Sequence, residues 1–240
     1  MYNKKHPLKV VTLCSGYDSQ CMALDRLTKY KSTFAYDLVA WSEIDKNAIK
    51  AHNLVYPQWA DRNLGDMTKI DWSKVPDFDF LTYSTPCQDF SNAGKQLGGQ
   101  EGSGTRSSIL WYTRNAILEK KPKYMMLENV KALVSKKFKP MFLKWVAELE
   151  SYGYYNYWQV LNAKDYGVPQ NRERVFLISI RKDVADDKPY NFPKPFPLEK
   201  RIKDILEPEV DDSYYLSEKA LDYFRRVSDD PSHCHKFQPK

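Results

Sequence analysis

The sequence predicts an α/β fold built on a mostly parallel sheet, and two observations support this prediction. Short apolar segments alternate with longer segments in which apolar residues recur at helical spacing, as is typical of βαβ units. The run LKVVTLC at residues 8–14 is almost continuously apolar, as expected for a strand buried on both faces of a parallel sheet. The chain has 240 residues, 42% of them hydrophobic, so it is long enough for one such domain with a buried core and a small appendage.

The expected elements follow in order along the chain. Strands are expected over residues 8–14, 38–42, 79–83, 124–127, 155–161 and 174–180. Helices are expected over residues 19–27, 46–56, 107–119 and 138–152. The last two strands lie close together in the sequence, which favours an antiparallel pair.

Two segments interrupt this alternation. Residues 89–106 are rich in Gly, Ser, Asn and Gln, a composition typical of a mobile functional loop or of a disordered one. Beyond Lys182 the composition changes, and several prolines follow within a few residues. We therefore expect a main domain over residues 1–185, and a linker with the beginning of a second domain over residues 186–240.

Composition excludes some classes of protein and leaves others open. A net charge of +6 permits a polyanionic partner without requiring one. No stretch approaches the roughly 20 apolar residues of a membrane span, and the N-terminus lacks the apolar region of a signal peptide. We expect a cytoplasmic protein without membrane association. The four cysteines show no paired CxxC spacing, so neither a disulfide framework nor a metal site is expected.

Polar and reactive side chains follow the expected strands, at the point where each strand ends. In a doubly wound sheet, ligands bind at the carboxyl ends of the strands, so we expect these residues to share one edge. The positions are Ser15 and Gly16, Glu43, Asp66, Pro86 and Cys87, and Glu128 with Asn129 and Val130.

Glu43 is suited to a nucleoside ligand, because a carboxylate offers two oxygens to two adjacent ribose hydroxyls. The alternative role is a negative charge that stabilises a helix N-terminus. The turn after the first strand contains only Gly16 and lacks the pattern GxGxxG. A dinucleotide oxidoreductase is therefore disfavoured, and a smaller nucleoside ligand fits better.

Cys87 follows Pro86 and opens the Gly-rich segment. A thiol at this edge is nucleophilic where nearby cations favour the thiolate, although most cysteines are small buried apolar residues. Glu128 ends a buried strand and would bring a carboxyl group to the same edge, able to donate a proton or a hydrogen bond. A surface charge or a helix cap is the alternative for Glu128.

Arg172 and Arg174 alternate with Glu173, so both guanidinium groups point to one side of an extended segment. There they could orient a base carbonyl or a phosphate. Surface arginines in a charged strand are the alternative interpretation.

Three motifs, taken in order, resemble the signature of the DNA cytosine-C5 methyltransferase family. They are Pro86-Cys87-Gln88, Glu128-Asn129-Val130 and Gln170-Asn171-Arg172-Glu173-Arg174. Glu43 and Gly65-Asp66-Met67-Thr68 extend the resemblance, which covers residues 10 to about 180. It implies a Rossmann-like fold of the S-adenosylmethionine-dependent methyltransferases, with a mostly parallel seven-stranded sheet and an antiparallel late strand.

The resemblance also implies a mechanism. Cys87 would add to C6 of a flipped cytosine, whose C5 then takes the methyl group of S-adenosyl-L-methionine. Glu128 would hold N3 and the exocyclic amine, Arg174 the base carbonyl, and Arg172 would help to fix Cys87 and the base. The Gly-rich segment resembles the loop that closes over the base. The substrate contacts that the motifs imply are Pro86, Gln88, Ser91, Arg106, Asn129 and Val130.

On the cofactor side, the resemblance assigns Glu43 to the ribose and Asp66 to the adenine amino group. Ile44 and Met67 would flank the adenine ring. The remaining implied contacts are Ser15 and Gly16, against the methionine part, and Pro86.

The chain departs from the family in two respects. Family members usually begin with Phe-x-Gly-x-Gly, whereas this chain has Cys14-Ser15-Gly16-Tyr17-Asp18, without the aromatic residue and the second glycine. Family members also continue into a target recognition domain and C-terminal motifs. Residues 214–240 correspond at most to the beginning of that recognition domain. We therefore expect a truncated product, one subunit of a split enzyme or a degenerate relative.

The sequence thus predicts a DNA cytosine C5-methyltransferase of a prokaryote or phage, acting in DNA methylation or restriction-modification. Its expected partners are double-stranded DNA and a C-terminal partner subunit that supplies the missing recognition segment. Two alternatives stay open. A tRNA cytosine C5-methyltransferase could share these motifs, because the chemistry depends on the base and not on the sugar, and a non-catalytic or partner-dependent remnant would bind nucleic acid only.

Overall fold

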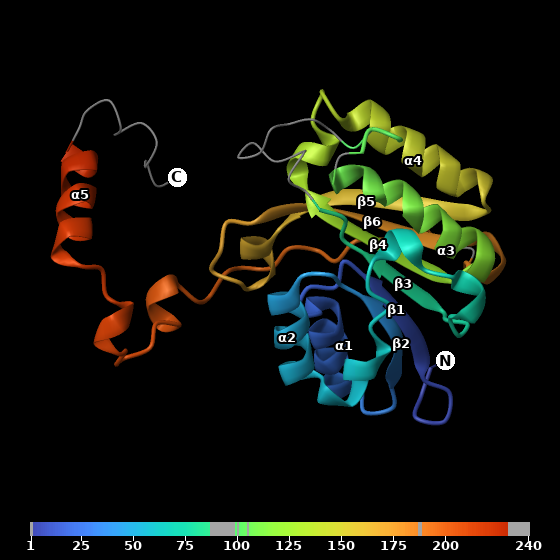
Figure 1. Ribbon diagram of the computed structural model, residues 1–240, viewed down its shortest axis with the longest axis horizontal. Helices are drawn as coiled ribbons and strands as arrows, with labels where there is room; N and C mark the ends of the chain where they lie inside the picture. The colour runs from blue at the N-terminus through green and yellow to red at the C-terminus, as the bar shows by residue number, and fades with distance from the viewer. Residues whose placement is uncertain (1, 87–98, 100, 105, 187–188, 230–240) are drawn as a thin grey trace. The chain divides into compact units, whose positions relative to one another are not determined.

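The computed structural model describes residues 2–86, 99, 101–104, 106–186 and 189–229. Within these residues one sheet has the strand order β2-β1-β3-β4-β6-β5 (Figure 1). Its strands are β1 (Leu8–Leu13), β2 (Tyr36–Ser42), β3 (Phe80–Tyr83), β4 (Tyr124–Val130), β5 (Tyr154–Asn162) and β6 (Glu173–Arg181). The pairs β1·β2, β1·β3 and β3·β4 are parallel, whereas β6 runs antiparallel to both β4 and β5. The mostly parallel sheet with an antiparallel late strand is confirmed.

The number of strands differs from the expectation. The described residues form six strands and not seven. Between β2 and β3 the chain forms the helix α2 (Lys46–Val55) and three short 3-10 helices, the first of which begins with Pro57. This segment meets β2 at a single isolated bridge, Trp41 to Asn63. A single bridge is not a strand, so the described part of this segment adds no seventh strand to the sheet.

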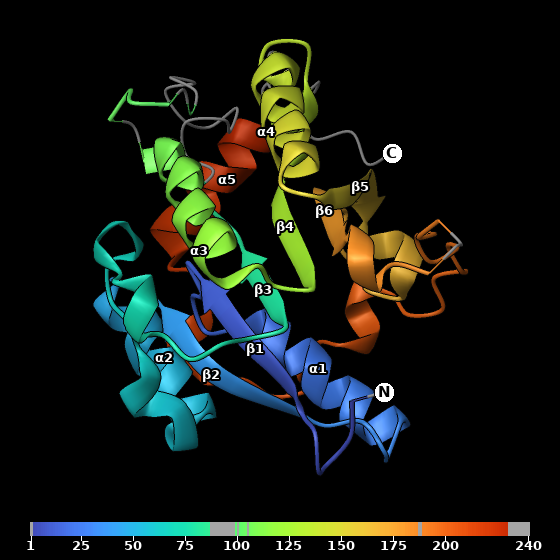
Figure 2. The same ribbon diagram turned by 90° about the vertical axis from the view of Figure 1, so that its right-hand side faces the viewer.

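Four helices cover the two faces of the sheet. Helices α1 (Ser19–Tyr30) and α2 lie on one face, and α3 (Thr113–Lys120) and α4 (Lys139–Ser151) on the other (Figures 1 and 2). Asp45 caps α2 by accepting hydrogen bonds from the backbone N–H groups of Asn47 and Ala48, which have no partner within the helix. The expected helix over 107–119 is divided, because residues 106–112 are a 3-10 helix and only the following turns are α-helical.

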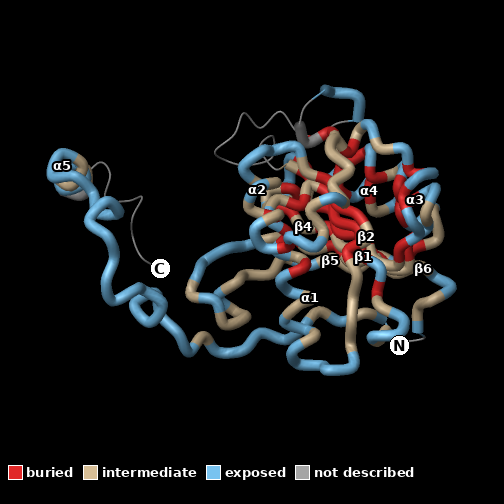
Figure 3. The backbone as a smooth tube through the Cα atoms, turned by 60° about the horizontal axis from the view of Figure 1, so that its bottom comes forward, coloured by how far each residue is buried: buried red, intermediate tan, exposed pale blue. Residues whose placement is uncertain are grey.

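The core consists of the strands and the helix faces packed against them (Figure 3). The first strand is buried on both faces, with Val10 and Val11 at 0% exposure. Val10 packs with Trp41 on the side of α1 and α2, whereas Val11 belongs to the larger cluster that includes Trp145 of α4. Burial on both faces of the sheet therefore explains the uninterrupted apolar run.

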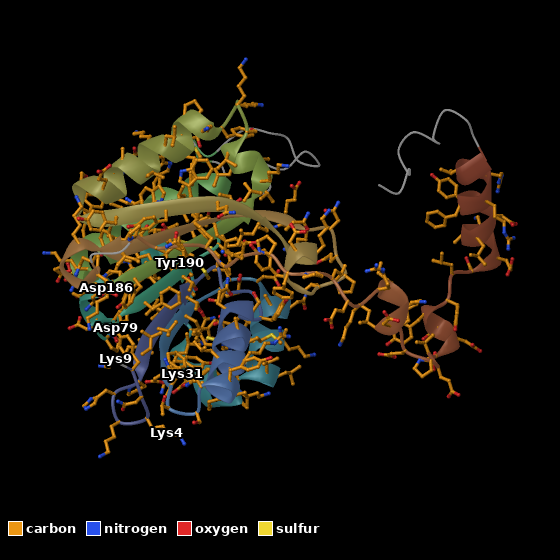
Figure 4. All side chains as sticks on the ribbon, turned by 180° about the vertical axis from the view of Figure 1, so that it is seen from behind. Lys4, Lys9, Lys31, Asp79, Asp186 and Tyr190 are labelled. Carbon is orange, nitrogen blue, oxygen red and sulfur yellow. The ribbon has the colours of Figure 1, made fainter. Side chains whose placement is uncertain are left out.

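An ion pair joins two segments at the amino-terminal edge of the sheet. Asp79, just before β3, lies 2.8 Å from Lys123 Nζ and accepts a hydrogen bond of 3.2 Å from the backbone N–H of Lys9 (Figure 4). Hydrogen bonding with Lys123, with Lys9 N–H and with Tyr2 outweighs the opposing effect of burial and lowers the pKa of Asp79. These structural contacts lie beside a cavity of about 750 Å³ that includes Tyr2, Lys123 and Tyr124.

The chain divides into two compact units, residues 1–198 and 199–240. The segment after residue 185, where a boundary was expected, still belongs to the first unit. The Tyr190 ring lies 5.9 Å from that of Tyr157 in β5, and Phe196 N–H donates to Asp165 O at 3.0 Å. The second unit contains α5 (Glu218–Asp229) and two short 3-10 helices, and none of its described residues is buried. In the described part of the chain, no helix combines the length and apolar character needed to span a membrane.

Candidate active site

The register of the sheet aligns the ends of β1, β2 and β3 with Leu127, which lies within β4. Leu13 of β1 pairs with Ser42 of β2 on one side and with Tyr83 of β3 on the other, and Tyr83 pairs with Leu127 of β4. The residues that follow these positions therefore stand side by side at the carboxyl edge. They are Glu43, Cys14, Ser84 and Glu128. The shared edge expected from the sequence is present.

The turn after β1 approaches the end of β2 through backbone contacts. Cys14, Gly16 and Asp18 have φ angles of +52°, +58° and +66°. Ser15 N–H donates to Ser42 O at 3.1 Å, and Gly16 N–H donates to Glu43 Oε2 at 2.9 Å. Asp18 stands where the family's second glycine is expected, and aspartate is one of the few residues that adopt this left-handed conformation with little strain. The shape of the turn is therefore compatible with the loss of that glycine.

A cavity of about 640 Å³ opens at this edge and has the size of a nucleoside-cofactor site. Of the residues that the sequence assigned to a cofactor, five line it: Glu43, Ile44, Asp66, Met67 and Pro86. Ser15 and Gly16 do not line it. Gly16 N–H donates a hydrogen bond to Glu43, which does line the cavity, and Ser15 lines a second, neighbouring cavity.

Glu43 is held rigidly. Its Oε1 accepts hydrogen bonds from the N–H groups of Ile44 at 2.8 Å and Asp45 at 2.9 Å, while Oε2 accepts the bond from Gly16. A carboxylate has about four acceptor directions, so at least one direction stays open for a ribose hydroxyl. The N–H groups of Ile44 and Asp45 lie just before α2, whose N-terminus is capped by Asp45.

Asp66 is also fixed as an acceptor. Its Oδ1 accepts hydrogen bonds from Thr68 N–H at 3.0 Å and Thr68 Oγ1 at 2.8 Å. These bonds lower the pKa of Asp66, with a smaller contribution from Lys69. An ionised carboxylate only accepts hydrogen bonds, as binding to an adenine amino group requires.

Cys14 lies between Met67 and the acidic residues of this cavity. Its Sγ is 3.5 Å from Met67 Sδ. Burial, assisted by the negative charges of Glu43 and Asp66, raises the pKa of the Cys14 thiol to about 12. This thiol stays protonated at neutral pH and does not compete as a nucleophile.

A second cavity, of about 660 Å³, adjoins the first. It contains Ser15, Gln20, Glu128 and Arg172, and it shares Cys14 and Ser84 with the cofactor-sized cavity. Gln20 Nε2 lies 3.3 Å from Ser84 Oγ, in hydrogen-bond contact. Because the two cavities share a wall, groups bound in them would meet there. Sequence reasoning missed Gln20 and Ser84, whose only signal was a polar side chain beside a strand end.

Glu128 and Arg174 form an ion pair at the edge of the second cavity. Arg174 Nε lies 3.1 Å from Glu128 Oε1, and the side chains are 22% and 24% exposed. The antiparallel register of β4 and β6 creates this contact by placing Val130 opposite Arg174. A smaller cavity of about 380 Å³ contacts both residues and Arg172. Val130 is partly buried against the core.

Asn129 is buried, at 2% exposure. Its Nδ2 donates to Thr85 O at 3.1 Å, and its Oδ1 accepts a hydrogen bond from Val130 N–H at 2.9 Å. The side chain therefore holds the backbone just before Pro86, so any effect on a substrate would pass through that segment.

Several predicted residues cannot be located. Cys87, Gln88 and Ser91 lie outside the described residues, and of Arg106 the structure describes only the backbone, at the start of a 3-10 helix. Within the described residues, no cluster of His, Cys, Asp or Glu could hold a metal ion.

Comparison with known proteins gives the family. The family model of the C-5 cytosine-specific DNA methylases matches residues 8–238. The type II methyltransferase M2.ScrFI of Lactococcus lactis subsp. cremoris is 50% identical over 171 residues, which cover 71% of this chain and 45% of that protein. The orphan methyltransferase M.SPRI of Bacillus phage SPR is 35% identical, over 88% of this chain and 52% of that protein.

Solved structures support the fold. A DNMT2 mutant of Spodoptera frugiperda superimposes with a TM-score of 0.71 at 20% identity, covering 92% of this chain and 65% of that one. The methyltransferase EhMeth of Entamoeba histolytica gives 0.70 at 19% identity, covering 90% and 64%. The chain spans about half the length of the curated relatives it matches. The family match over nearly its whole length, together with the aligned strand ends, shows that this chain belongs to the C-5 cytosine-specific DNA methylase family.

Proposed function

We propose that this chain carries the catalytic core of a DNA cytosine C5-methyltransferase. One observation carries the proposal: a cavity lined by Glu128, whose carboxylate pairs with Arg174, shares Cys14 and Ser84 with a cavity of nucleoside-cofactor size. Pro86 lines the cofactor-sized cavity, and Cys87 follows it directly in the chain. Type II and orphan methyltransferases of bacteria and phages are among the relatives that this chain matches, which favours DNA as the substrate.

The residues fit S-adenosyl-L-methionine, the cofactor of this family, which supplies the methyl group when bound. Glu43 would hold the ribose hydroxyls and Asp66 the adenine amino group, as both carboxylates keep acceptor positions. Met67 and Ile44 would flank the adenine ring. Ser15 and Gly16 would receive the methionine part. Met67 is buried at 5% exposure, so it is a fixed wall for an aromatic ring.

On the substrate side, Cys87 Sγ would form a bond to C6 of a flipped cytosine, and the electrons of the C5–C6 double bond then allow C5 to take up the methyl group. Loss of the C5 proton and elimination of Cys87 restore the ring. Glu128 would bind N3 and the exocyclic amine, and Arg174 the base carbonyl. Their ion pair holds both side chains in place before the base arrives, which reduces reorganisation during the reaction.

We further propose that residues 1–185 form the catalytic domain, and residues 186–240 a linker and the start of a target recognition domain. The family match extends to residue 238, which supports this continuation. The relatives are about twice as long, so recognition of a DNA sequence would depend on polypeptide corresponding to their other half, supplied in our proposal by a C-terminal partner subunit. The bacterial and phage relatives favour the cytoplasm of a bacterium as the place of action.

The test is methyl transfer from labelled S-adenosyl-L-methionine into double-stranded DNA and into tRNA. The chain is assayed alone and with the C-terminal half of the Lactococcus lactis relative added in trans. We expect label in DNA, and a covalent adduct with DNA containing 5-fluorocytosine that Cys87→Ser abolishes. Label in tRNA alone would favour the tRNA enzyme. Cofactor binding without any adduct, even with the added half, would favour a remnant that only binds nucleic acid.

A further inference from the structure

A buried carboxylate and a buried imidazole face one another behind the turn that follows β1. Asp18 and His52 are both at 0% exposure, and His52 Nε2 lies 3.7 Å from Asp18 Oδ2. At this separation the two atoms are in contact but beyond hydrogen-bond distance, and His52 Nε2 has no other hydrogen-bond partner among the described residues. Neither residue lines the cofactor-sized cavity. Burying such groups costs free energy, so their presence beside a ligand site requires a reason.

Asp18 links the two elements that flank the turn. Its Oδ2 accepts a hydrogen bond from Thr12 Oγ1 in β1 at 2.8 Å, and its Oδ1 accepts one from Cys21 N–H in the first turn of α1 at 3.3 Å. Asp18 N–H donates to Ser15 O at 2.8 Å, which closes the turn. Ser15 and Gly16, the residues proposed to receive the methionine part, lie inside this loop of contacts.

His52 links Asp18 to the ribose side of the site. The His52 ring stacks on Trp41 of β2, with 3.7 Å between ring centroids and 19° between ring planes. Trp41 is followed closely by Glu43, and His52 belongs to α2, which begins just beyond it. The Glu43–Gly16 hydrogen bond joins the same two segments at the cavity. The turn after β1 is thus joined to the segment after β2 twice. The Glu43–Gly16 hydrogen bond joins them at the cavity, and the contact of Asp18 with His52 joins them in the core.

We propose that Asp18 and His52 are positioning residues that hold the Ser15-Gly16 turn in the shape that binds the amino-acid end of the cofactor. This inference rests on the proposed function. Asp18 supplies the left-handed conformation, with φ +66°, and its carboxylate ties the turn to β1, α1 and α2. Asp18 thus adopts a left-handed φ at the position where the family resemblance led us to expect a glycine.

The test compares two ligands that differ in the amino-acid part. S-adenosyl-L-homocysteine carries it, and 5′-methylthioadenosine lacks it. Calorimetry on the full chain gives both dissociation constants. We expect Asp18→Ala to weaken S-adenosyl-L-homocysteine binding by roughly 10-fold, because alanine resists the left-handed conformation. The affinity for 5′-methylthioadenosine should change much less. Asp18→Gly should lose less than Asp18→Ala, since glycine adopts this φ without strain.

Two controls separate positioning from general stability. Asp25→Asn alters a carboxylate of α1 that lies away from the turn. This carboxylate accepts hydrogen bonds from Tyr36 and Tyr56. The substitution should lower the melting temperature and leave the ratio of the two dissociation constants unchanged. Glu43→Ala should weaken both ligands, because both contain the ribose.

A double-mutant cycle tests the pair itself. His52→Gln removes the imidazole that faces Asp18 and should weaken S-adenosyl-L-homocysteine binding selectively when it is the only substitution. In the Asp18→Gly background it should have no further effect, since its partner is gone. These two variants carry the test if Asp18→Ala does not fold.

The outcomes are distinct. If the wild-type chain binds neither ligand, the proposed cofactor function fails, and this inference with it. If the wild type binds both and Asp18→Ala, Asp18→Gly and His52→Gln leave the ratio of dissociation constants unchanged, only the positioning role is overturned. Strictly additive effects in the cycle would overturn the pairing of Asp18 with His52.

Discussion

At the scale of single residues, Cys14 and Cys87 are suited to opposite tasks. Cys14 is buried beside two carboxylates, which raises the pKa of its thiol to about 12 and keeps it protonated. Cys87, the proposed nucleophile, needs the thiolate form and lies outside the described residues. A neutral thiol at Cys14 leaves the shared wall of the two cavities chemically inert.

The raised pKa of Cys14 predicts a loss of stability in alkaline solution. Its pKa is 9.0 in the reference state and about 12 in the folded protein. Between these values the unfolded chain has released the proton and the folded chain has not, so the free energy of unfolding falls as pH rises. The slope for one group is about 1.4 kcal/mol per pH unit. Urea denaturation from pH 8 to pH 11 should show a steeper fall for the wild type than for Cys14→Ala. Parallel curves would contradict this assignment, since buried tyrosines contribute equally to both proteins.

Glu128 and Glu173 offer a matched comparison, because both are carboxylates next to Arg174. Glu128→Gln should lower the rate of methyl transfer by about 100-fold or more, since an amide cannot reproduce both hydrogen bonds of the carboxyl group to the base in the transition state. Its dissociation constant for S-adenosyl-L-homocysteine should stay unchanged. Glu173→Gln removes only an exposed ion pair with Lys131 and should leave the rate near that of the wild type. Equal losses in both variants would indicate a general electrostatic effect instead of contact with the base.

At the scale of elements, α3 and α4 hold the end of the Gly-rich segment. Trp111 Nε1, just before α3, donates to Gly99 O at 2.8 Å. Glu101 binds Arg114 of α3 at 2.7 Å and Lys144 of α4 at 3.3 Å. Arg114 also pairs with Glu148 of α4. These contacts hold Gly99 and Glu101, near the C-terminal end of the Gly-rich segment, against α3 and α4.

Glu101→Ala should therefore loosen this segment locally. Because Glu101 is a surface group, the melting temperature should change little. Hydrogen exchange of the backbone N–H groups at residues 101–104 should become faster, since two tethers to the helices are lost. Glu150→Ala, on the exposed face of α4, is the control and should leave this exchange unaltered. Unchanged exchange in Glu101→Ala would show that Trp111 alone holds the segment.

At the scale of the whole molecule, the buried core lies in the first unit. The last buried apolar residue of the described chain is Leu177, and residues 199 to 227 have no buried side chain. A chain ending at Leu198 should therefore unfold cooperatively at the melting temperature of the full chain. It should also keep the affinity for S-adenosyl-L-homocysteine. Calorimetry of both chains tests this, and a large fall in melting temperature would show that residues 199–240 stabilise the first unit.

The sequence by itself determined the kinds of elements, their order and the strand ends that carry polar residues. Apolar periodicity and turn residues are local properties, so they could be read without knowledge of long-range contacts. The buried first strand and Glu43 and Glu128 at the carboxyl edge follow from such patterns. The motifs added the family, which the comparisons confirm.

Only the tertiary structure decided which side chains meet. The register of β1 with its neighbours places Cys14 and Ser84 between two cavities, and the reversed direction of β6 joins Arg174 to Glu128. The burial of His52 beside Asp18 depends on how α2 packs on the sheet. The described residues form six strands where seven were expected, because the segment after α2 meets β2 at a single bridge. Pairing, register and burial arise from contacts between distant parts of the chain, and a single local pattern does not encode them.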